Sequence, residues 1–124
     1  MAPAESTKMS DQELALIVLQ QGKPQQVLAK FLNLMLNYQC GLSIVVAPDP
    51  TKASSLLSEH EGKVRCVCVI QEEEITEQTT LLALGQRGNV PLFLILPTKK
   101  LGLQRMACSG LGRVSFCAWE QAFS

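Results

Sequence analysis

The chain has 124 residues, of which 47% are hydrophobic and 18% charged, and eleven basic residues balance eleven acidic ones to a formal net charge of zero. This length suits one domain with a core large enough to fold without disulfides or a structural metal. The zero net charge argues against indiscriminate nucleic-acid binding, for which a basic excess is typical. No apolar run approaches the ~20 residues needed to cross a bilayer. We therefore expect a disordered tail at residues 1–10 and a single domain, not embedded in a membrane, over residues 11–124.

The number and surroundings of the cysteines indicate the cellular compartment in which the protein works. The five cysteines are odd in number and mostly lie in apolar runs, which favours buried thiols in a reducing environment over a disulfide framework. Cys66 and Cys68 are two residues apart, whereas zinc sites usually use a wider gap and further ligands elsewhere. We predict an intracellular protein of the cytoplasm or nucleus, with no metal and no cofactor.

The amino-terminal part of the chain predicts two helices. Ser10 and Glu13 have the spacing of a capping box, which satisfies free backbone N–H groups at a helix start, so a helix is expected from there to Gly22. After Pro24, apolar residues recur at helical spacing over Val27–Met35. Because this second helix is apolar over a broad face, we expect it to pack on a sheet, and it is also a candidate surface for a homodimer.

The remainder of the chain alternates strand and helix patterns. Four short apolar runs predict strands, at Leu42–Ala47, Val64–Ile70, Pro91–Pro97 and Val114–Trp119. Three helices are expected between them, at Thr51–His60, Thr76–Gln86 and Thr98–Cys108. This alternation predicts an α/β fold, a three-layer α/β/α sandwich with a four-stranded, helix-covered, largely parallel sheet.

Two of the strand-to-helix junctions contain residues that typically begin a helix. Asp49 is placed to cap the first of these three helices, with Pro50 at its first position, and Thr98 is placed to cap the last. The run Leu42–Ala47 is continuously apolar and β-branched, which is typical of a central strand covered on both faces.

Patterns of catalysis are absent from the sequence. The single histidine, His60, lies in a polar stretch, which favours a surface position over a catalytic triad. The adjacent acids Glu72–Glu74 seldom converge on one ion. Residues 109–113 lack the spacing of a phosphate-binding glycine loop and run from a helix into a strand. We therefore predict no catalytic residues and no enzyme.

Short matches to a known family occur in order along residues 42–120. Residues 47–53, Ala-Pro-Asp-Pro-Thr-Lys-Ala, are similar to an Ala/Thr-Asn-Glu-x-Thr-Lys-Ala segment, and residues 62–70 to a Gly-Lys-x-x-Leu-Val-x-Ile strand entry. Residues 89–91 and 101–102 repeat an Asn-Val-Pro…Leu-Gly spacing. Together these resemble the kink-turn-binding ribosomal protein superfamily, which includes nucleolar ribonucleoprotein core proteins and Gadd-type growth-arrest proteins. The Asn-Glu pair of that family is Pro48-Asp49 in this chain.

This resemblance implies a non-catalytic RNA-binding or scaffolding subunit of a ribonucleoprotein, with structured RNA or ribonucleoprotein proteins as partners. In open α/β sheets, ligands gather beyond the carboxyl ends of the strands, where hydroxyls and lysines suit phosphate contact. The residues expected to contact RNA or another partner are Asp49, Thr51, Lys52, Lys99, Lys100 and Arg113.

A second resemblance competes with the first. Residues 42–50 are similar to the first strand of a response-regulator receiver, and residues 89–98 to its fourth. The phosphoryl-accepting aspartate would then be expected where Gln71 follows the strand Val64–Ile70, and one strand–helix unit would be missing. The alternative function is a degenerate pseudo-receiver that serves protein–protein contacts in signalling. Four strands favour the first resemblance and five the second.

Overall fold

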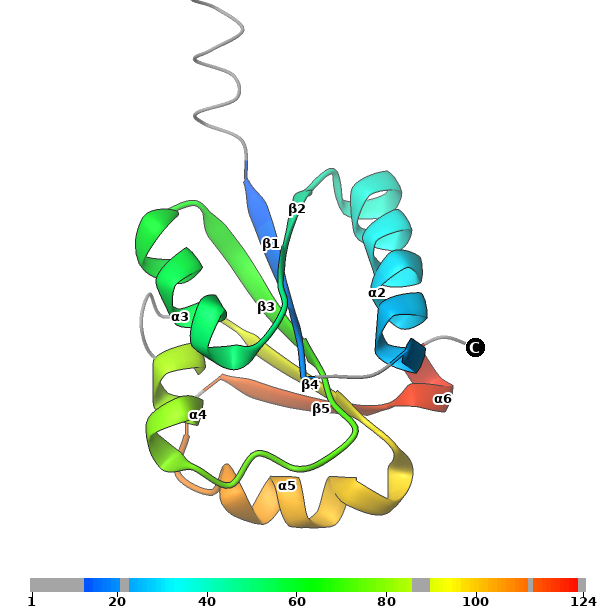
Figure 1. Cartoon of the computed structure of the whole chain (residues 1–124), viewed down its shortest axis with the longest axis vertical. Coiled ribbons are helices and arrows are strands. Elements are labelled where there is room, and N and C mark those ends of the chain that lie inside the picture. The colour runs from blue at the N-terminus through cyan, green and yellow to red at the C-terminus, as the bar shows by residue number, and fades with distance from the viewer. Residues whose placement is uncertain (1–12, 21–22, 86–89, 112, 123–124) are drawn as a thin grey trace, which may run out of the picture.

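The computed structural model describes residues 13–20, 23–85, 90–111 and 113–122, and its centre is a parallel sheet with helices on both faces (Figure 1). The strands are β1 (Leu14–Leu19), β2 (Ser43–Ala47), β3 (Val64–Ile70), β4 (Leu92–Leu96) and β5 (Val114–Ala118). They pair in the spatial order β2-β1-β3-β4-β5, and every pairing is parallel. The predicted tail at residues 1–10 lies outside the described residues.

The first strand corrects the predicted amino-terminal helix. Residues 14–19 form β1, which lies between β2 and β3, and its four inner residues are buried. Six consecutive apolar residues offer no polar face, which a helix on a protein surface needs, but they suit a parallel strand covered on both sides. Glu13, expected to close a capping box, instead accepts a hydrogen bond from Arg65 at 2.9 Å.

The helices divide between the two faces of the sheet. One face carries α2 (Lys23–Met35), its π-helical extension η1 (Leu36–Cys40) and the short α6 (Trp119–Ala122). The other carries α3 (Pro50–Glu59), α4 (Gln78–Gly85) and α5 (Leu101–Ala107), the last preceded by the 3₁₀ turn η2 (Thr98–Lys100). Figure 1 shows α2 standing apart from α3, α4 and α5, with the sheet between them.

Each face has its own hydrophobic core. The larger core joins alternate strand residues to α3, α4 and α5, and its fully buried members include Leu16, Leu81 and Leu94. The smaller core lies under α2, where Ala29 and Leu32 pack against the opposite side of the strands. The expectation that the Val27–Met35 helix packs on the sheet is therefore confirmed.

Several local predictions are confirmed and others corrected. The Asp49 carboxylate accepts a hydrogen bond from the Lys52 backbone N–H at 2.8 Å and caps α3, as predicted. Residues 43–47, expected at the centre of the sheet, form an edge strand because β1 occupies the central position. Thr98 does not cap a helix, since its hydroxyl donates to Glu120.

The predicted α/β fold with a helix-covered parallel sheet is confirmed, but the sheet has five strands and not four. The additional strand is β1, and together with the helix α2 it forms a further strand–helix unit. The order 2-1-3-4-5 is the doubly wound order shared by flavodoxins and response-regulator receivers. Residues 43–47 therefore form the second strand of such a fold, not the first, whereas β4 occupies the fourth position.

Candidate functional site

The carboxyl edge of the sheet is the first candidate region. The loops after β1, β2, β3 and β4 meet there, and in a doubly wound sheet of this order a ligand crevice is expected between β1 and β3. A cavity of about 340 Å³ opens at this edge. Its lining is largely polar and comprises Gln20, Pro50, Thr51, Glu74, Ile75, Thr76, Glu77 and Thr80.

Gln20, which directly follows β1, fastens the loop after β3. Its side-chain oxygen accepts hydrogen bonds from the backbone N–H groups of Glu72 and Glu73, each at 2.9 Å. Its Nε2 donates to the carbonyl oxygen of Glu73 at 3.1 Å. The Gln20 side chain therefore crosses from β1 to the loop after β3 and holds that loop in place.

Gln71 directly follows β3 and belongs to a second, buried amide network. Its Nε2 donates to the side-chain oxygen of Gln104 on α5 at 2.9 Å, and to the carbonyl oxygen of Glu73 at 3.0 Å. Gln104 also accepts from the N–H of Ile75 at 2.7 Å and donates to the carbonyl oxygen of Ile75 at 2.9 Å. Gln71 and Gln104 are both completely buried. This network ties α5 to the loop between β3 and α4.

Charged groups close the outer side of the same loop. Lys100 Nζ lies 2.9 Å from Glu73 Oε2 and 3.8 Å from Glu74 Oε2. The hydrogen bond to Glu73 and the charges of both carboxylates raise the pKa of Lys100. Next to them, the Thr98 hydroxyl donates to Glu120 Oε2 at 2.8 Å and lowers the pKa of that carboxyl.

The six predicted binding residues do not form one cluster. Asp49, Thr51 and Lys52 begin α3 after the edge strand β2, whereas Lys99 and Lys100 follow β4. Because β1 and β3 separate β2 from β4, the acidic loop after β3 lies between the two groups. Arg113 precedes β5 and therefore lies at the amino edge of the parallel sheet, opposite the other five.

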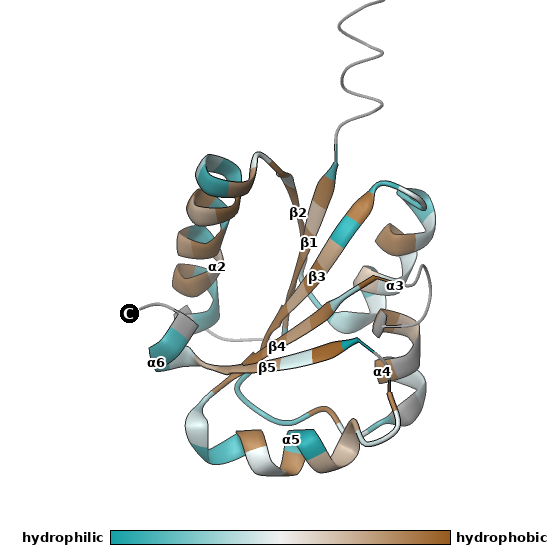
Figure 2. Cartoon of the chain, turned by 180° about the vertical axis from the view of Figure 1, so that it is seen from behind, coloured by the Kyte–Doolittle hydropathy of each residue, from teal (hydrophilic) through white to brown (hydrophobic). Residues whose placement is uncertain are grey.

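The outer face of α2 is the second candidate region. Four large apolar side chains follow one another there with spacings of four, three and four residues. Val27 is 67% exposed, Phe31 45%, Leu34 58% and Tyr38, on η1, 83%. We call these four residues the α2 seam. Figure 2 shows that hydrophobic residues recur along most of α2. The sheet covers the side of α2 that carries Ala29 and Leu32, and Gln26, Lys30 and Asn33 form a polar side. The α2 seam is therefore a second apolar stripe, on a side of the helix that faces away from the sheet.

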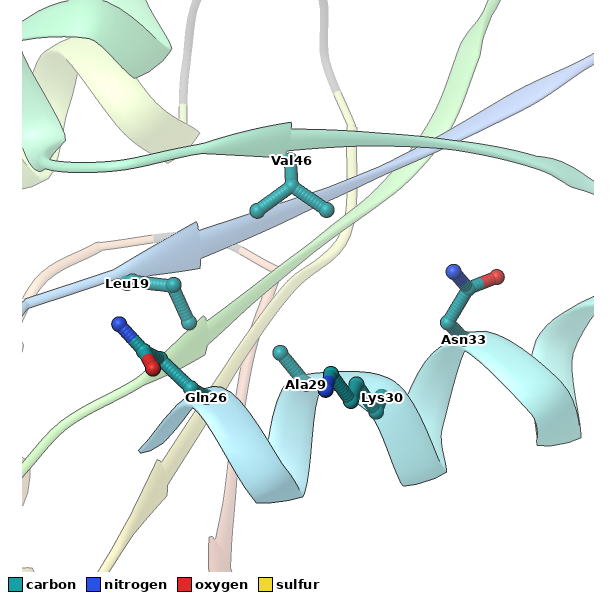
Figure 3. Close-up of a pocket in the computed structure, with 6 residues that line it drawn as sticks. All are labelled: Leu19, Gln26, Ala29, Lys30, Asn33 and Val46. Carbon is teal, nitrogen blue, oxygen red and sulfur yellow. The ribbon is translucent and has the colours of Figure 1, made fainter. Parts of the chain in front are cut away.

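A shallow groove runs between α2 and the edge strand β2. It encloses about 240 Å³, less than the roughly 300–1,000 Å³ typical of small-molecule sites. Figure 3 shows Val46, Leu19 and Ala29 directed into the space between strand and helix, with Gln26 and Asn33 extending from the helix at either end. The groove adds apolar surface beside α2.

The cysteines are free thiols among the described residues. Cys66 and Cys68 project from the same side of β3 into the smaller core, as their strand spacing predicts. Contact with Cys66, together with burial, raises the pKa of Cys68. The described ranges contain no group of three histidine, cysteine, aspartate or glutamate side chains placed to hold a metal ion.

Sequence reasoning missed Gln20 and Gln104. Both are neutral side chains in segments read for their apolar pattern, and their bonding partners lie 52 and 33 residues away in the chain. Gln71 was identified, but only as a residue that cannot accept a phosphoryl group.

In the part of the chain that the structure describes, no helix has the length and apolarity to span a membrane. No protein-family model matches the chain, and no curated protein matches it to a significant degree.

Proposed function

We propose that the chain is a non-catalytic protein-interaction domain built on the receiver topology, with amide side chains where a receiver carries the acidic groups of its phosphoacceptor edge. The observation that carries the proposal is the pair of glutamines at the ends of β1 and β3. A receiver needs acidic groups there to hold a metal ion and accept a phosphoryl group. Gln20 and Gln71 instead bind backbone groups of the loop after β3, and Gln71 also binds the amide of Gln104 on α5.

The α2 seam is the surface that we propose contacts another protein. Contiguous exposed apolar residues on a small protein commonly mark a contact with another macromolecule. Of the two regions, only α2 combines exposure with large apolar side chains, since the cavity at the carboxyl edge is lined largely by polar groups. We also propose that the protein works in a reducing compartment inside the cell, as its free cysteines led us to expect.

A ribonucleoprotein subunit is the rival function. The exposed Thr51, Lys52 and Lys99 favour it, because hydroxyl and ammonium groups suit phosphate. Its support is weaker, because Lys100 is paired with acids and Arg113 lies at the opposite edge.

Photocrosslinking separates the two functions. A photoreactive amino acid would replace Leu34 in one variant, Lys99 in a second and Leu103, an exposed residue of α5, in a control. After irradiation in cells, nuclease and protease treatments distinguish RNA adducts from protein adducts. We expect protein adducts from position 34 and few from position 103. RNA adducts from position 99, without protein adducts from position 34, would overturn the proposal.

A second test addresses the carboxyl edge. We expect no mass increase of one phosphoryl group when the protein is incubated with Mg²⁺ and a small-molecule phosphodonor. Phosphorylation of an acidic residue in the loop after β3 would contradict a filled, inactive edge.

A further inference from the structure

The α2 seam has the geometry of a helix-pairing surface. Its residues follow the alternation of three and four that places side chains along one stripe of a helix, as in the a and d positions of coiled coils. Val27, Phe31 and Leu34 span two turns of α2, and Tyr38 continues the row into η1. The stripe lies on the side of α2 away from the buried Ala29 and Leu32.

The charge around this stripe suits a second copy of the same chain. The seam itself carries no charge. Lys30, which lies one helical turn from both Val27 and Leu34, flanks it, and its long side chain can hold the ammonium group in solvent at the rim of a contact. Two copies related by a two-fold axis bring identical patches together, so any strong charge on the patch would repel itself. The formal net charge of zero also removes long-range repulsion between copies.

The α2 seam supplies most of the area that a specific contact needs. At roughly 150–250 Å² for a large side chain, the exposed fractions of the α2 seam amount to on the order of 400–500 Å² per copy. Two such patches would bury on the order of 800–1,000 Å², close to the roughly 1,000 Å² expected of a specific interface. The flanking residues of α2 would add to this area.

We infer that the partner of the α2 seam is a second copy of this chain, held in a symmetric dimer by pairing of the two α2 helices. The inference rests on the proposed function, since it names the partner of the protein-contact surface. The partner that we infer is a second copy of the chain, and the test below would also reveal a different protein bound to the same face.

The test is sedimentation velocity of the full chain over a concentration series around the micromolar range. We expect a reversible dimer. Leu34→Glu should raise the dissociation constant at least about tenfold, because each dimer would then bury two like charges. Met106→Glu is the matched control, since Met106 is 74% exposed on α5, on the other side of the sheet, and should leave the constant unchanged.

A charge-pair experiment guards against misfolding of the variant. Leu34→Glu and Leu34→Lys proteins should each be monomeric alone and should associate when mixed, because opposite charges then meet across the seam. A strictly monomeric wild-type chain, or equal weakening by Met106→Glu, would overturn the inference. If the wild-type chain is monomeric but position 34 crosslinks to a different protein, the dimer inference fails while the proposed function stands. RNA adducts without protein adducts would remove both.

Discussion

The carboxyl edge of the sheet buries polar side chains, whereas the outer face of α2 exposes apolar ones. At the edge, the amides of Gln71 and Gln104 are completely buried and bonded to each other and to the adjacent loop. On α2 and its extension η1, apolar side chains such as Leu34 and Tyr38 face solvent. A buried polar group must be paired or it costs free energy, so the edge has a defined geometry. An exposed apolar side chain contributes little to folding and is available for a contact with another molecule.

The largest effect on stability is expected at the edge, from Gln104→Leu. The change removes the partners of Ile75 N–H, Ile75 C=O and the Gln71 amide. Because each buried group left unpaired costs roughly 1–3 kcal/mol, we expect the free energy of unfolding to fall by about 2–4 kcal/mol in urea denaturation. Gln26→Leu, at an exposed site on α2, is the control and should change it by less than ~0.5 kcal/mol. Equal effects from the two variants would contradict the contrast between the regions.

A smaller and more local effect is expected from Gln20→Ala. Three hydrogen bonds to Glu72 and Glu73 are lost, but the loop can turn these backbone groups toward water. We expect a loss of about 1 kcal/mol in the free energy of unfolding. Native-state hydrogen exchange should accelerate at the amides of Glu72 and Glu73. The amide of Ile75, which Gln104 holds, provides the internal reference, and unchanged exchange at Glu72 and Glu73 would show that Gln20 does not restrain the loop.

A substitution in the α2 seam is expected to change the free energy of unfolding even less. Leu34→Ser, measured in dilute solution where the chain is monomeric, should alter the free energy of unfolding by less than ~0.5 kcal/mol. The control is Leu32→Ala on the buried side of the same helix, which should cost about 2–4 kcal/mol because it leaves a cavity in the smaller core. If Leu34→Ser destabilised the monomer as strongly as Leu32→Ala, the α2 seam would be part of the core and not a contact surface.

The smallest expected effect is a titration at the outer rim of the edge. The hydrogen bond from Thr98 favours the charged carboxylate of Glu120, so its folded-state pKa lies below the ordinary value. This interaction adds stability above the ordinary pKa of the carboxyl, and that stability is lost as the pH falls through the lowered pKa. Thr98→Val should therefore raise the pKa of Glu120 in an NMR titration. An unchanged pKa of Glu120 in Thr98→Val would show that the hydroxyl does not hold the carboxylate.

Much of the fold follows from patterns that are local in the sequence. Val64–Ile70 was predicted with the bounds that β3 has, because a short run rich in valine and isoleucine, set between polar segments, favours a strand. The start of α3 was equally predictable, since Asp49 and Pro50 act on their own backbone neighbours. The meeting of the loops after β2, β3 and β4 at one edge of the sheet was also predictable, because parallel strands direct all their carboxyl ends to one side. That this edge binds a partner stays a prediction.

What the sequence by itself determined was the alternation of strand and helix, the capping of α3 and the broadly apolar character of α2. Only the tertiary structure decided that residues 14–19 form a central strand, since a run of apolar residues without a period is compatible with either element until neighbouring strands supply hydrogen bonds. It also decided that Gln20, Gln71 and Gln104 belong to the same edge, because residues separated by tens of positions are brought together only by the sheet. Which side of α2 faces solvent is determined in the same way, by the position of the sheet against which the helix packs.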